Sequence, residues 1–137
     1  MFKFSTRSLK NLETCHPDLQ VLFSEVLKFY DCAIIEGYRS EKDQNAAFEN
    51  GKSKLKYPNG KHNKIPSMAV DAAPFPFPQW KNVLDFVFFA GHVCAIAKML
   101  KNEGLMHYDV RYGGDWDKDE KVSNNRFNDY VHFELVD

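Results

Sequence analysis

Apolar side chains recur along residues 17–30 with the three- and four-residue spacing of a helix that buries one face. They are Leu19, Leu22, Phe23, Val26, Leu27 and Tyr30. Pro17 and Asp18 suit the first turn, because that turn does not use the missing amide of proline and its dipole favours an acidic side chain. The pattern predicts an amphipathic helix over 17–30 and a short apolar strand over 32–35.

Two further helices are marked by their ends. Ser40 precedes residues 41–49 as an N-cap, because its hydroxyl can accept from the free amides of the first turn, and Gly51 ends that helix. The apolar stretch 82–103 stops at a glycine and predicts a long helix. Polar and charged residues interrupt its most apolar part, 83–100, so we expect a buried helix there and not a membrane span.

Three later segments, 67–73, 106–112 and 131–136, are predicted as strands. The connecting segments are polar, proline-rich or charged: 52–66, 74–78 and 113–128. Helices at the start and in the middle, combined with several short strands, predict an α+β fold. We expect a single domain over residues 1–137, because this length supplies one core but is too short for two ordinary domains.

Two of these strands place a chemically active side chain opposite a core-facing set. Because side chains alternate between the faces of a strand, the core sets are expected to be Met68, Val70 and Ala72, and Val131, Phe133 and Leu135. Asp71 then stands on the other face among small residues, which leave room for a metal and a substrate. His132 and Glu134 share the corresponding face of the last strand, where a histidine is placed to act as a ligand.

Asp71 and His132, with His62 in the preceding loop, are a carboxylate and two imidazoles. This is a ligand set of catalytic zinc, which keeps one coordination position open for water. Asp129, three residues before His132, is an acid that can take a proton from that water. It has the opposite strand parity to His132, so it reaches the site only if the chain bends before the last strand. With Arg39, the set indicates a zinc hydrolase.

Each ligand also has a simpler interpretation. His62 lies in a loop of lysine, asparagine and glycine and on its own fits a solvated histidine. On its own, His132 fits a half-buried histidine with ordinary hydrogen bonds. Asp71 is harder to dismiss, because a buried carboxylate without a partner is costly. The remaining histidines fit structural roles, with His107 at a strand start kept as a minor candidate for the site.

The charge balance narrows the function. With 18 basic and 19 acidic residues the formal net charge is -1, whereas nucleic-acid binders usually carry a strong basic excess, so a metal nuclease is disfavoured. The three cysteines are widely spaced and form no CxxC pair, which favours reduced thiols in a cytosolic protein. No apolar run typical of a signal peptide lies at the N-terminus, so we expect the protein to be made in the cytoplasm and to need help to leave it.

Five segments carry a resemblance to a known family. They are TCHPDLQVLFSEVLKFYDC at 14–32, GYRSEKDQNAAFENGKSKL at 37–55, KHNKIPSMAVDAAPFP at 61–76, RYGGDWD at 111–117 and NRFNDYVHFELV at 125–136. In this order they resemble phage endolysins of the M15 zinc peptidase family, the L-alanyl-D-glutamate peptidase or D-alanyl-D-alanine carboxypeptidase-like group. The resemblance implies a small antiparallel sheet with helices packed on it, like Hedgehog and D-Ala-D-Ala peptidases.

The resemblance also implies roles for the site residues. His62, Asp71 and His132 match the zinc ligands, and Asp129 matches the general base. Arg39 matches an arginine that holds the substrate carbonyl or stabilises the oxyanion, a role suited to a fixed guanidinium. The chain departs from the broader family in its longer separation of nine positions between His62 and Asp71, and in having aspartate, not glutamate, as the base. Further candidates for the cleft are Asp115, Trp116 and Tyr130.

The expected function is that of an endolysin that cleaves the L-alanyl-D-glutamate bond of the peptidoglycan stem peptide. Alternatives that stay open are a D,D-carboxypeptidase or dipeptidase with the same zinc site and a non-catalytic zinc-stabilised binding module, although retention of Arg39 and Asp129 disfavours the latter. We expect a monomer without membrane insertion or nucleic-acid partners. It would wait in the host cytoplasm, pass the membrane with a holin, and act on the wall of a Gram-negative host in the periplasm.

Overall fold

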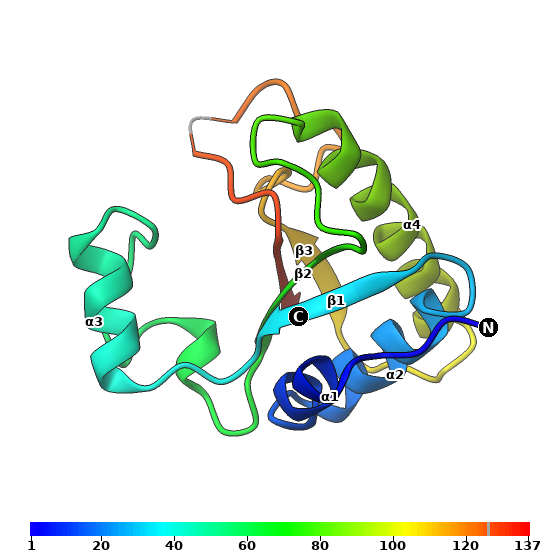
Figure 1. Cartoon of the computed structure of the whole chain (residues 1–137), viewed down its shortest axis with the longest axis horizontal. Helices are drawn as coiled ribbons and strands as arrows, with labels where there is room; N and C mark the ends of the chain where they lie inside the picture. Colours follow the sequence, from blue (N-terminus) through cyan, green and yellow to red (C-terminus); the bar gives the residue numbers. More distant parts are fainter. Residues whose placement is uncertain (126) are drawn as a thin grey trace.

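The computed structural model describes residues 1–125 and 127–137. Four antiparallel strands form one sheet in the order β1-β2-β4-β3. Their bounds are Cys32–Glu36 (β1), Ala69–Pro74 (β2), Asp109–Tyr112 (β3) and His132–Val136 (β4). The helices are Thr6–Glu13 (α1), Pro17–Val26 (α2), Glu41–Glu49 (α3) and Val83–Asn102 (α4), with a 3-10 turn at Lys61–Asn63 (η1). The predicted α+β class is confirmed, and Figure 1 shows α1, α2 and α4 on one side of the sheet with α3 set apart on the other.

The core lies between the sheet and helices α2 and α4. Phe133 on β4 is fully buried, and its ring centroid is 5.7 Å from that of Phe23 on α2 and 6.3 Å from that of Phe89 on α4. Val70 of β2 and Leu135 of β4 belong to the same cluster. The predicted alternation therefore holds for Val70, Ala72, Phe133 and Leu135, and the opposite face of both strands carries Asp71, His132 and Glu134. Val131, which was also predicted for the core face, lies before the first residue of β4 and packs instead with Ala73 and Phe86 in a separate cluster, because the chain bends there.

Helix α4 is long and apolar enough, by length and composition, to cross a membrane, as core helices of globular proteins often are. Phe89, Ala90 and Val93 on one side of it are buried in the core cluster. The predicted buried helix is therefore confirmed for that side, whereas Leu84 and Phe88 on the other side are exposed.

Helix α1 was not predicted from the pattern of apolar residues, because polar side chains attach it to β1. The Ser8 hydroxyl accepts from the backbone amide of Ile34 at 3.0 Å, and the Asn11 amide donates to the carbonyls of Ile34 and Ile35 at 2.8 and 3.0 Å. These bonds occupy backbone groups of β1, an edge strand that would otherwise present them to solvent or to another chain. Leu12 is the buried apolar residue of the helix, too little for periodicity to detect.

The first predicted helix is four residues too long and the third strand three residues too long at its start, since α2 ends at Val26 and β3 begins at Asp109. Asp18 explains the second difference. Its carboxylate accepts the backbone amides of His107 and Tyr108 at 2.8 and 2.9 Å, so this segment bonds to the start of α2 and not to the sheet. This contact also places His107 at the beginning of α2, among partners unrelated to the candidate ligands.

Candidate metal centre

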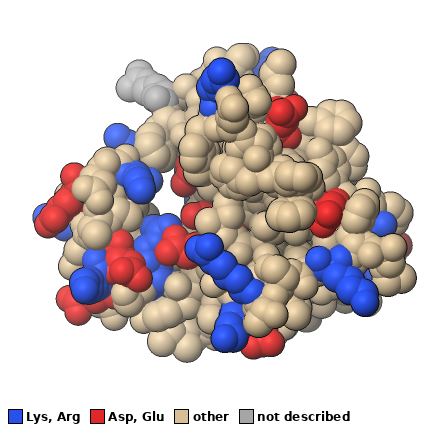
Figure 2. All heavy atoms as spheres, viewed as in Figure 1, with Lys and Arg blue, Asp and Glu red and all other residues tan. Residues whose placement is uncertain are grey.

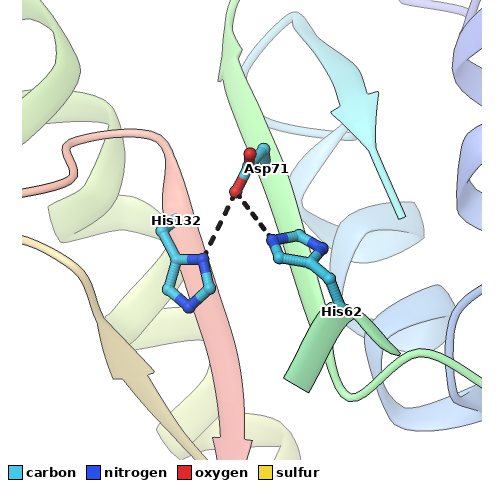
Figure 3. Close-up of side chains that lie close together, drawn as sticks. All are labelled: His62, Asp71 and His132. Atoms are coloured by element: carbon cyan, nitrogen blue, oxygen red, sulfur yellow. Dashed lines mark hydrogen bonds and ion pairs between the residues drawn. The ribbon is translucent and has the colours of Figure 1, made fainter. Parts of the chain in front are cut away.

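The three predicted ligands meet on the face of the sheet opposite α2 and α4, where Figure 3 shows their side chains pointing toward one another. Asp71 on β2 pairs directly with His132, the first residue of β4, and η1 brings His62 to the same point. One Asp71 oxygen, Oδ1, lies 3.2 Å from Nε2 of His62 and 3.4 Å from Nδ1 of His132. One ligand atom from each residue lies within 4.8 Å of the others, a spacing that suits a single metal ion.

The loop geometry explains how His62 reaches Asp71 despite the longer separation in sequence. Nδ1 of His62 donates to the carbonyl of Gly37 at 2.7 Å, which leaves Nε2 free to face Asp71. The backbone amide of Arg39 donates in turn to the His62 carbonyl at 2.8 Å. The side chain of His62 is 4% exposed, so the interpretation as a solvated loop histidine is wrong.

Glu134 fixes the second imidazole. Strand alternation predicted that it shares a face with His132 but assigned it no role. Nε2 of His132 donates to Oε1 of Glu134 at 2.8 Å, so that Nδ1 is the nitrogen turned toward Asp71. Arg111 donates to the other Glu134 oxygen at 2.6 Å, and the ammonium of Lys61 lies 3.9 Å from it. Buried carboxylates of this kind orient metal-binding histidines and select their tautomer.

Opposite charges face one another within the cluster. Burial disfavours the imidazolium form of His132, but the carboxylates of Asp71 and Glu134 outweigh it and raise the pKa of His132 to about 9. Burial likewise raises the pKa of Glu134, but His132 and Arg111 outweigh it and bring the value to about 2. The two imidazoles hold the pKa of Asp71 well below its ordinary value despite burial. A dication would take the place of the imidazolium charge, since metal ligands must be deprotonated.

Asp129 reaches the site through the bend that its strand parity requires. The chain turns before β4, where the amide of His132 donates to the Asp129 carbonyl at 3.1 Å and the amide of Asp129 donates to the Gly113 carbonyl at 2.8 Å. A side chain on Gly113 would lie 2.2 Å from the Asp129 carbonyl oxygen, so glycine is needed for this close approach. Burial, followed by the charge of Asp71, raises the pKa of the Asp129 carboxyl to about 6.

Arg39 lies beside the cluster and is braced on both sides. Its guanidinium approaches Oδ2 of Asp71 at 3.6 Å, the oxygen that faces away from the two imidazoles. Nε donates to Glu36 at 3.0 Å and Nη1 to the side-chain oxygen of Gln44 at 3.1 Å. Gln44 is fully buried on α3 and donates to Ser53 at 2.9 Å, so it joins the arginine to the following loop. The sequence analysis did not identify Gln44. The available signal was its position on the predicted helix, five residues after Arg39.

Two cavities, of about 590 and 610 Å³, adjoin the cluster. His62 and His132 line the first and Asp71 lines the second. Four residues line both: Arg39, Lys52, Phe127 and Asp129. Figure 2 shows a hollow between the part of the molecule formed by α3 and its main body, with acidic and basic side chains gathered around it.

Of the three further cleft candidates, Trp116 lines the first cavity. Its ring lies 5.4 Å from that of His132, and its indole donates to the Phe127 carbonyl at 2.7 Å. Asp115 instead accepts backbone amides within its own loop, and Tyr130 packs against the core. The described residues that line the two cavities include neither of them.

Comparison with known proteins gives the family. The family model described as phage L-alanyl-D-glutamate peptidase matches residues 1–136. The L-alanyl-D-glutamate peptidase of Escherichia phage T5 is 30% identical over 144 residues, covering 98% of this chain and 98% of that protein. The crystal structure of the Serratia marcescens L-Ala D-Glu endopeptidase ChiX matches with a TM-score of 0.71 at 22% identity, over 98% of this chain and 90% of that one, which shows a shared fold. The chain belongs to the phage L-alanyl-D-glutamate peptidase family.

Proposed function

We propose that this protein is a zinc-dependent peptidoglycan hydrolase that cleaves the L-alanyl-D-glutamate bond of the stem peptide to lyse a host cell. The observation that carries the proposal is the convergence of His62, Asp71 and His132, within 4.8 Å of one another, at the junction of two cavities. Two imidazoles whose second nitrogens are already bonded, together with one carboxylate, fit a catalytic zinc with an open position. Membership of a peptidase family supports hydrolysis of a peptide bond.

A zinc ion held by His62, Asp71 and His132 would lower the pKa of a bound water to about 7 and polarise the scissile carbonyl. Asp129 accepts a proton from the attacking water and later returns it to the leaving amine of D-glutamate. Arg39 stabilises the negative charge that develops on the carbonyl oxygen, and its contacts with Glu36 and Gln44 hold it in place before the reaction. The ring of Trp116 packs beside that of His132 at the wall of the first cavity.

The biological setting is part of the same proposal. We expect one monomeric domain over residues 1–137, stored in the host cytoplasm and released by a holin to the wall in the periplasm. The family name supports action on the cell wall. A carboxypeptidase with the same zinc site remains the second candidate. Asp129 and Arg39 line the same cleft as the triad, which argues against a non-catalytic binding module.

Glu134 gives a prediction that does not depend on turnover. Glu134→Ala removes the acceptor that holds the His132 tautomer, so we expect zinc affinity to fall by about 10- to 100-fold. Glu134→Gln keeps an acceptor for the Nε2 hydrogen and should retain most of the affinity. Competition with a chelating zinc indicator measures both, and thermal unfolding of each apo variant reports whether the fold survives. Equal zinc affinity in the folded Ala variant and the wild type would remove this role.

Hydrolysis of purified Gram-negative sacculi tests the function. The zinc-loaded protein should solubilise them, the chelator-treated protein should not, and added zinc should restore activity. Short peptides that end in D-alanyl-D-alanine separate the two candidates, because a carboxypeptidase releases D-alanine from them and an L-alanyl-D-glutamate endopeptidase does not. Solubilisation that persists after complete removal of the metal would overturn the zinc mechanism.

A further inference from the structure

The two cavities beside the metal centre differ in charge. Apart from the shared residues, the first is lined by Lys54, Lys61 and Arg111 against Asp117 and Glu134. The second contributes only carboxylates of its own: Glu36, Asp43 and Asp71. Since both also share Arg39, Lys52 and Asp129, the described residues leave the first cavity the more positive and the second the more negative. A substrate that is itself charged on one side only would be oriented by this difference.

Two of the lysines are available to a ligand. Among the described residues, Lys61 and Arg111 form ion pairs with Glu134, whereas no ion pair involves Lys52 or Lys54. The ammonium of Lys54 lies 4.9 Å from the ring centre of Phe127, which lines both cavities. This contact places the charge beside Phe127, at the wall of the first cavity, without neutralising it.

The second cavity has an aromatic residue at its wall. Trp80 lines it, is 65% exposed, and stacks on Phe86 with an interplanar angle of 12° and a centroid distance of 5.4 Å. Its outer face is therefore a flat, supported apolar surface. Such a surface suits the face of an uncharged sugar ring better than a carboxylate-rich peptide.

The bond assigned above divides its substrate into an uncharged and an anionic part. On the amino side lies L-alanine, whose nitrogen is bound in an amide to the lactyl group of muramic acid, so this side carries no charge. On the other side D-glutamate continues through its γ-carboxyl group and keeps a free α-carboxylate one carbon away from the scissile nitrogen. The diamino acid and D-alanine that follow bear further carboxylates.

We propose that the first cavity, with Lys54 and the Lys52 that it shares with the second cavity, binds the α-carboxylate of D-glutamate and the stem peptide after it. The second cavity, with Trp80, receives L-alanine and the muramoyl sugar. This assignment rests on the proposed function, and it fixes the direction in which the substrate crosses the metal centre. It makes Lys54 a specificity residue for a free carboxylate next to the scissile bond.

The test compares two synthetic muramoyl peptides that differ in one group: one contains D-glutamate, the other D-isoglutamine, in which the α-carboxylate is an amide. Wild-type kcat/KM should be higher for D-glutamate, and this preference should shrink as salt is added. Lys54→Gln should lower kcat/KM for the D-glutamate peptide by about fivefold and leave the amidated peptide within about twofold of wild type. Lys56→Gln is the matched control, because its ammonium lies over Phe48 and it lines neither cavity.

Trp80→Ala tests the other half of the assignment. It should lower kcat/KM for the muramoyl peptide but not for the same peptide without the sugar. Phe88→Ala changes another exposed aromatic residue that lines neither cavity, and it should affect neither substrate.

If Lys54→Gln lowers kcat/KM equally for the D-glutamate and D-isoglutamine peptides, or for neither, the carboxylate site is refuted while the endopeptidase function stands. Failure of the wild type to cleave either peptide refutes the proposed function itself.

Discussion

Asp129→Asn is expected to reduce kcat by about 10²- to 10⁴-fold while zinc stays bound, because asparagine keeps the size of the side chain but cannot accept a proton from water. The turn that Asp129 makes with Gly113 and His132 uses backbone groups, so the substitution leaves it intact. Initial rates on a synthetic L-alanyl-D-glutamate peptide, together with zinc content by elemental analysis, measure both parts. A folded variant that loses its zinc would show that Asp129 serves the metal and not the proton transfer.

The pH dependence of the activity tests the role of Asp129 as general base independently. Burial and Asp71 raise the pKa of Asp129 to about 6 in the metal-free protein, and a dication near it would lower that value because it favours the carboxylate. A general base works when deprotonated, so activity should rise with pH through an acid limb at or below about pH 6. The residual activity of Asp129→Asn should lack that limb. An unchanged limb in the variant would assign it to another group.

His132→Ala is expected to abolish both zinc binding and turnover, since two of three ligands seldom hold a catalytic zinc at micromolar concentrations. Removal of this imidazole also leaves Oε1 of Glu134 without its hydrogen-bond donor, so the apo variant should be less stable by about 1–3 kcal/mol. Zinc content after dialysis and the midpoint of urea unfolding measure the two effects.

The control for this experiment is His107→Ala. The side chain of His107 is 83% exposed and contacts Asp18 at the start of α2, so its loss should leave zinc content and kcat unchanged. If His132→Ala retains one equivalent of zinc, His132 is not a ligand. If His107→Ala also loses zinc, the effect of His132→Ala reflects folding and not coordination.

The strand alternation carried the most information about the site. It separated the core side of β2 and β4 from the side that bears Asp71, His132 and Glu134, because both strands are central in the sheet and bury one face under helices. The bend that brings Asp129 to the site was also predictable. In a continuous strand, Asp129 would face the side opposite to His132, so a shared site requires a bend between them. The position of His62 was not predictable, because it depends on a bond to the distant Gly37 carbonyl.

Other features of the fold could not be predicted from the pattern of apolar residues. Helix α1 docks through Ser8 and Asn11, and the start of the third predicted strand bonds to Asp18, so polar side chains decided what periodicity could not. Gln44 joins α3 to Arg39 through amide contacts across the loop. Such contacts link residues far apart in the chain, and a single sequence gives no sign of which pairs meet.

Mass spectrometry of the fragments released from purified Gram-negative peptidoglycan tests the central claim most directly. The account predicts stem peptides with D-glutamate at their amino terminus, and glycan strands that retain muramoyl-L-alanine. Release of terminal D-alanine alone, with the L-alanyl-D-glutamate bond intact, would contradict it and make the protein a carboxypeptidase.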